Sequence, residues 1–179
     1  MFKIKNMVLA AMFVALGVVL PIAFHSIPNA GSIFLPMHIP VLLCGLICGW
    51  PYGLACGILA PLLSSLLTSM PPMAYLPSML CELAVYGLVA GLLIYLIHTK
   101  IYLLDLYISL IGAMITGRLI AGVLKALIFN AGSYSMQAWI SGSFVTALPG
   151  IIIQIVAIPI VVFMLEKAKL IDKRYELSK

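Results

Sequence analysis

Long apolar stretches, separated by short segments richer in polar residues, make up almost the whole chain. Six of them are predicted to cross a membrane, because about 20 residues of helix span a hydrocarbon core about 30 Å thick. The predicted spans are residues 4–23, 39–49, 51–68, 78–98, 102–128 and 138–166. The stretch 39–49 is short for a full span, which is consistent with a tilted or half-inserted helix. The stretches lack the alternation of polar and apolar residues that is typical of barrel strands, so helices are predicted throughout.

The composition leads to the same class. Of the 179 residues, 64% are hydrophobic and 8% are charged, which leaves too little polar surface for a soluble globule. The segments outside the spans are too short to form a core of their own. We therefore expect one transmembrane domain over residues 1–179: an all-α integral membrane protein, folded as a compact bundle of six helices with long extracellular loops.

The basic residues predict the orientation of this bundle. Eight of the ten fall on one side of the predicted membrane: Lys3, Lys5, Lys100, Lys167, Lys169, Lys173, Arg174 and Lys179. Because Lys and Arg are enriched in cytoplasmic segments, both termini are predicted to be cytoplasmic, including a basic tail at 167–179. The net charge of +5 therefore reflects topology and gives no reason to expect a nucleic-acid partner.

The connections predicted to face outward are 24–38, 69–77 and 129–137, and they are longer than the inner ones. All three combine aromatic or Met side chains with hydrogen-bonding groups, as small-molecule pockets do. This asymmetry predicts a binding site on the outer side.

Arg118, Lys125 and Glu82 lie within predicted spans, away from the inner ends of their helices. Arg118 is about 24 Å along its helix from the inner end, and Lys125 follows two turns later on the same face. Lys125 is shallow enough to extend its ammonium to the surface. A charge in hydrocarbon is costly and usually faces a cavity or a partner. Two interpretations of Arg118 stay open, and they can coexist: an ion pair with Glu82, or a cation at the floor of a ligand cavity.

Two further polar residues in the spans have structural interpretations. Asp105 lies near the inner end of its helix and is expected among the lipid headgroups. Gln154 lies between Pro149 and Pro159, and is expected to bond a backbone carbonyl that a proline leaves free.

Small residues recur at helix-packing intervals. Glycines repeat every four positions from Gly45 to Gly57, and again at Gly87 and Gly91, which predicts close internal helix contacts. Ala11 and Ala15 form a similar strip on the first span, where both internal packing and docking of a partner membrane protein remain open.

Catalysis is not predicted. The four cysteines lie within spans and are expected to behave as small apolar residues, with no metal site. Motifs of zinc hydrolases, of serine hydrolases and of phosphate-binding loops are missing from the sequence. A hydrolase that uses His38 is the weakest alternative.

The chain resembles the substrate-binding components (S components) of energy-coupling factor (ECF) vitamin transporters over its whole length. The more specific similarities are 34–40 (Phe-Leu-Pro-Met-His-Ile-Pro), 61–68 with 70–72, 112–118 and 148–151. The segments are closest to pantothenate or pyridoxine-like members. The Ala11 and Ala15 strip matches the motif with which such components dock on their coupling protein.

This resemblance implies a division of labour in a bacterial cell membrane. The S component captures its vitamin from outside, while a transmembrane coupling protein and two ATPase subunits drive uptake. ATP and Mg²⁺ would be used on those partners, and no cofactor is expected on this chain. The family's pocket is formed by the outer halves of the last three helices and covered by the first and third outer loops.

The resemblance and the charges together suggest roles for nine residues. Arg118 would anchor the charged end of a ligand. The other predicted substrate-binding residues are Glu82, Asn130, Gln137, Tyr134, Trp139, His38, Tyr75 and Lys125. A ligand carboxylate would suit the two cations and favours pantothenate, whereas Glu82 would suit a pyridoxine- or hydroxymethylpyrimidine-like vitamin. The alternative from another class is a structural or assembly subunit that transports nothing.

Overall fold

The protein is described by a computed structural model that covers residues 4–24, 29–129 and 135–171. These residues form helices and connecting turns, and six helical segments are long and apolar enough to cross a membrane. The α-helices are α1 (Ile4–Ala23), α2 (Ala30–Phe34), α3 (His38–Cys48), α4 (Trp50–Thr68), α5 (Leu76–Leu96), α6 (Tyr102–Leu124), α7 (Met136–Ile140) and α8 (Leu148–Lys167). Two π-helical segments are η1 (Lys125–Phe129) and η2 (Ser141–Thr146). The predicted all-α membrane fold is therefore confirmed.

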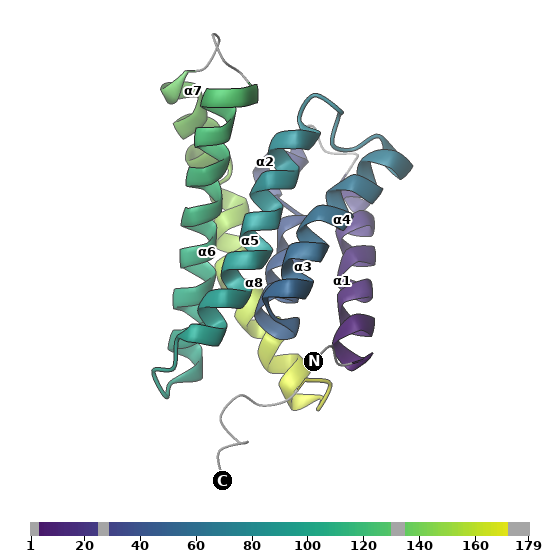
Figure 1. Ribbon diagram of the computed structural model, residues 1–179, viewed down its shortest axis with the longest axis vertical. Coiled ribbons are helices and arrows are strands. Elements are labelled where there is room, and N and C mark those ends of the chain that lie inside the picture. Colours follow the sequence, from purple (N-terminus) through teal and green to yellow (C-terminus); the bar gives the residue numbers. More distant parts are fainter. Residues whose placement is uncertain (1–3, 25–28, 130–134, 172–179) are drawn as a thin grey trace.

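The long helices run up and down a single bundle (Figure 1). The first turn of α1 and the last turn of α8 lie at one end, which we call the terminal end. The short helices α2 and α7 and the connection between α4 and α5 lie at the other, which we call the loop end (Figure 1). Helix α5 packs extensively against α3, α4 and α6, so it forms the centre of the bundle.

Glycines permit the close contacts of α3, α4 and α5. A Cβ atom on Gly87 of α5 would overlap the carbonyl of Gly53 on α4, and one on Gly57 would overlap the carbonyl of Leu83. One on Gly91 would overlap the backbone of Trp50. The predicted internal packing role of these glycine rows is confirmed, and it fits a membrane bundle in which backbones approach where small residues face each other.

The tight turn between α3 and α4 also depends on a glycine. Gly49 has a φ of 96°, a value that L side chains rarely adopt, and its N–H donates to the Gly45 carbonyl at 3.0 Å. Pro51 follows in the first turn of α4, where its missing N–H costs no hydrogen bond.

Two predicted segments differ from the structure. The connection 24–38 contains α2. Helices α2 and α3 together cover Ala30–Cys48, which is long enough to cross a membrane, so the second span is longer than predicted. The predicted helix 138–166 is instead divided into α7, η2 and α8. The break comes just before Pro149, in the first turn of α8, and proline is accommodated at the start of a helix rather than in its interior.

Asp105 is not among headgroups as expected. It is fully buried in the first turn of α6, where the Thr99 N–H and the Thr99 Oγ1 donate to its Oδ1 at 2.9 and 2.6 Å. The carboxylate thereby fixes the turn that joins α5 to α6.

Candidate functional site

Arg118 is a buried cation that borders a pocket. It lies on α6 in the half of the helix towards the loop end, with 3% of its surface exposed. The pocket has a volume of about 130 Å³ and is otherwise apolar. Its lining residues are Ile111, Met114, Ile115, Arg118, Phe144, Ile151 and Ile155, from α6, η2 and α8. Arg118 contributes to the wall of the pocket, whose surface is almost entirely apolar.

An aromatic contact orients this cation. The Arg118 Cζ atom lies 5.6 Å from the centroid of the Phe144 ring, within the range of a cation–π interaction. Phe144 belongs to η2, and its ring meets the Trp139 indole edge to face at 5.6 Å and 87°. The indole in turn lies against Gly122 of α6, where a Cβ would come within 2.6 Å of the indole Nε1.

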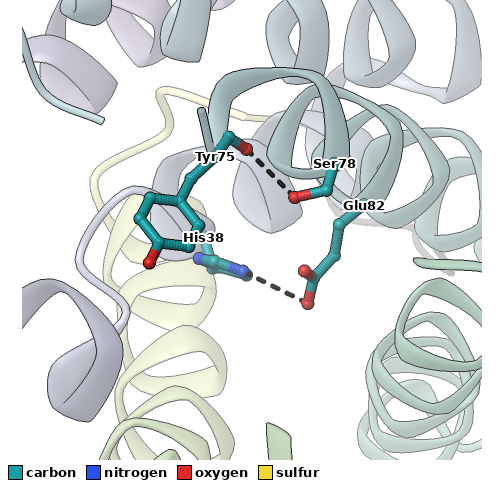
Figure 2. A network of polar contacts seen from close by, with 4 residues as sticks. All are labelled: His38, Tyr75, Ser78 and Glu82. Carbon is teal, nitrogen blue, oxygen red and sulfur yellow. Dashed lines mark hydrogen bonds and ion pairs between the residues drawn. The ribbon is translucent and has the colours of Figure 1, made fainter. Parts of the chain in front are cut away.

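A second polar group joins α3 to α5. His38 Nε2 and Glu82 Oε1 are 3.7 Å apart, at ion-pair distance if the imidazole is protonated (Figure 2). The His38 ring also meets the Tyr86 ring at 5.2 Å in an edge-on contact. The Tyr86 ring is packed so tightly on Gly117 that a Cβ there would overlap it. Gly117, which precedes Arg118, thus contacts α5, the helix that carries Glu82.

The ion pair between Arg118 and Glu82, one of the two interpretations that the sequence left open, is not formed. Within the described part of the chain, Glu82 is paired with His38, and no carboxylate pairs with Arg118. Arg118 and Lys125 act on Glu82 only through longer-range attraction. Lys125 begins η1 and is half-buried. The difference arises because His38 enters the core as the first residue of α3, rather than staying in an outer loop.

The remaining predicted residues are placed less centrally. Tyr75 is 67% exposed just before α5 and joins the network of Figure 2 through its backbone oxygen, which accepts from Ser78 Oγ at 3.0 Å. Gln137 is exposed on α7, and Trp139 is half-buried there. Asn130 and Tyr134 lie outside the described residues.

Sequence reasoning missed the apolar part of the site. Phe144 was not singled out, because helical periodicity does not place it beside Arg118. Tyr86, one turn from Glu82, carries no signal in the sequence that predicts its contacts with His38 and Gly117. The four isoleucines and Met114 look like ordinary lipid-facing or core residues in the sequence.

Gln154 also differs from its expectation. It is fully buried on α8, and neither its Oε1 nor its Nε2 has a hydrogen-bond partner in the described structure. It therefore does not bond a backbone carbonyl as predicted.

The first helix presents the predicted alanine strip on its surface. Ala11 and Ala15 are exposed on α1, whose buried residues, Phe13 and Gly17, point to the bundle instead. The interpretation that the alanine pair packs inside the bundle is therefore wrong. No cluster of metal-ligating side chains occurs among the residues described.

A bundle of six helices that are long and apolar enough to cross a membrane defines the class as a multi-pass membrane protein. The chain matches the family described as "ECF transporter, substrate-specific component" over residues 5–162. It therefore belongs to this family, and it is a transport subunit rather than an enzyme. Membership implies association with an ECF module, which consists of a transmembrane coupling protein and ATPases. Searches of curated proteins and of solved structures found no match.

Proposed function

We propose that this chain captures a water-soluble vitamin from outside the cell, with high affinity, for ATP-driven uptake by partner subunits. The best candidate is pantothenate. The observation that carries this choice is Arg118, which is buried against a pocket and has no carboxylate partner among the described residues. A buried guanidinium that is not neutralised by the protein is suited to bind a ligand carboxylate through two parallel hydrogen bonds.

The pairing of Glu82 supports the same choice. A pyridoxine- or hydroxymethylpyrimidine-like vitamin would use this carboxylate to accept from ring nitrogens or amino groups. The carboxylate instead faces His38 at 3.7 Å. Such a ligand would have to displace His38, whereas an anion at Arg118 displaces no ion pair.

The apolar floor suits the aliphatic part of pantothenate. Its branched dimethyl portion can be buried against Met114, Ile151 and Ile155 once the carboxylate is held. Apolar burial contributes about 25 cal/mol per Å² removed from water, so this floor adds affinity beyond the charge contact.

The orientation of the protein belongs to the proposal. Basic residues near both ends of the chain favour a cytoplasmic terminal end. The loop end, towards which Arg118 lies, then faces outward and admits the vitamin. The partners would be a coupling protein, which docks at Ala11 and Ala15, and two ATPase subunits, which use ATP and Mg²⁺. No cofactor is assigned to this chain.

The test is mass spectrometry of small molecules that the purified full chain retains after washing in detergent. Retained pantothenate is the expected result. Retained pyridoxine or an aminopyrimidine would show that the ligand is not pantothenate and would indicate binding at Glu82. If no vitamin is retained after incubation with each of these candidates, the proposal is overturned.

A further inference from the structure

We infer that Phe144 is a positioning residue for Arg118, and that the η2 segment which carries it determines the preference of the pocket for anionic over uncharged ligands. This inference rests on the proposed function, because it concerns how the same pocket distinguishes ligands.

The first step is the contact itself. The Phe144 ring lies under the Arg118 guanidinium at 5.6 Å, and both side chains line the pocket. A ring face attracts a cation without supplying a counter-charge, so this contact holds Arg118 in place without neutralising it. A carboxylate partner would have held it equally well, but would have neutralised the charge that attracts a ligand.

The second step is what holds Phe144. Its ring meets Trp139 at a right angle, and the indole lies on Gly122 of α6. Gly122 lies four positions after Arg118, so both contacts fall on one face of α6. Arg118, Phe144, Trp139 and Gly122 thus form a closed set of contacts between α6 and the continuous segment of α7 and η2.

The third step is the local helix geometry. Residues five positions apart are about 140° apart around an α-helix, so Trp139 and Phe144 would point in different directions. A π-helix has i to i+5 hydrogen bonds and a wider turn, which brings residues five apart closer to one face. The segment Ser141–Thr146 is π-helical. The π-turn therefore permits the contact of Trp139 with Phe144.

The fourth step is the consequence for ligands. Loss of the Phe144 ring face would let the guanidinium leave its position at the pocket. The affinity for a carboxylate would then fall more than the affinity for an uncharged ligand of the same shape. A cation–π contact of this kind corresponds to about a 3- to 30-fold change in affinity.

The position of the guanidinium can be tested without any ligand. The sequence has two arginines, Arg118 and Arg174, so Arg118 is the single arginine in an Arg174→Lys background. The reagent phenylglyoxal and intact-mass measurement then give the modification rate of Arg118 in the full chain. We expect a several-fold higher rate in Phe144→Leu and in Gly122→Ala, and an unchanged rate in Phe144→Tyr. Gly142→Ala is the control, since a Cβ there meets nothing within 4 Å. Equal rates in Phe144→Leu and Phe144→Tyr would overturn the inference.

Ligand preference is tested with pantothenate and its uncharged alcohol analogue, pantothenol. Phe144→Leu should weaken the binding of pantothenate about 3- to 30-fold more than it weakens the binding of pantothenol, and Phe144→Tyr should restore the difference. Equal losses for both compounds would mean that Phe144 only shapes the pocket, which overturns the inference. If the unmodified chain binds neither compound, the proposed substrate is wrong, while the modification rates still decide whether Phe144 positions Arg118.

Discussion

The Nε2 atom of His38 lies 3.7 Å from Oε1 of Glu82, so the carboxylate faces an imidazole rather than the guanidinium of Arg118. Both groups lie in the interior, with 4% and 17% of their side-chain surfaces exposed. The pair connects α3 with α5. Arg118, which lines the pocket, has no carboxylate partner among the described residues. We therefore propose separate roles for the two charges of α5 and α6: a structural role for Glu82 and ligand binding for Arg118.

The structural role predicts energetic coupling between His38 and Glu82. Either single substitution to Ala leaves a buried polar group without its partner and should lower the free energy of unfolding by about 1–3 kcal/mol. The double substitution should cost less than the sum, with a coupling of about 0.5–3 kcal/mol. The measurement is a double-mutant cycle of unfolding in mixed micelles. Additive losses would show that the two side chains do not interact.

The glycine contacts predict a large effect from a small substitution. Gly87→Ala places a Cβ against the Gly53 carbonyl and should destabilise the bundle by about 1–3 kcal/mol, as overpacking does. Gly31→Ala is the matched control, because a Cβ there meets nothing within 4 Å. The thermal midpoint in detergent should fall for Gly87→Ala and stay or rise slightly for the control. Equal midpoints would refute the close contact of α4 with α5.

The exposed face of α1 predicts a separation of docking from binding. Tryptophan at Ala11 and Ala15 should prevent assembly with the coupling protein, since flat strips of small residues allow helices to approach closely. Vitamin binding should be unchanged, because the alanines point away from the bundle. Leu16→Trp is the control, exposed on the same helix but about 100° from Ala15. Co-purification and ligand titration measure the two effects. Normal assembly of the double variant would exclude this face as the docking site.

The sequence predicted six membrane-crossing helices and the glycine contacts, because both follow from one-dimensional patterns. Apolar length is enough to recognise a helix that crosses a membrane, and glycines four positions apart indicate a close contact whichever helix is the partner. These patterns do not depend on how the helices are rotated in the bundle.

The partners of the charged residues could not be predicted in the same way. The position of Arg118 along its helix gives its depth, but its neighbours depend on the rotation of α5, α6 and α8. His38 follows a Pro- and Gly-containing segment that is typical of loops, and yet it starts α3 in the core. Phe144 was hidden because a π-turn changes the helical period, and the sequence carries no clear signal of that change.

Titration of the purified full chain with pantothenate tests the central claim most directly, with Arg118→Ala and Arg118→Lys measured beside the unmodified protein. We predict saturable binding by the unmodified chain, and a loss of about 10- to 100-fold for Arg118→Ala, as expected when a charged hydrogen bond is removed. Arg118→Lys should be intermediate, because lysine keeps the charge but lacks the planar pair of donors. Unchanged affinity in Arg118→Ala, with the fold intact by thermal midpoint, would contradict the account.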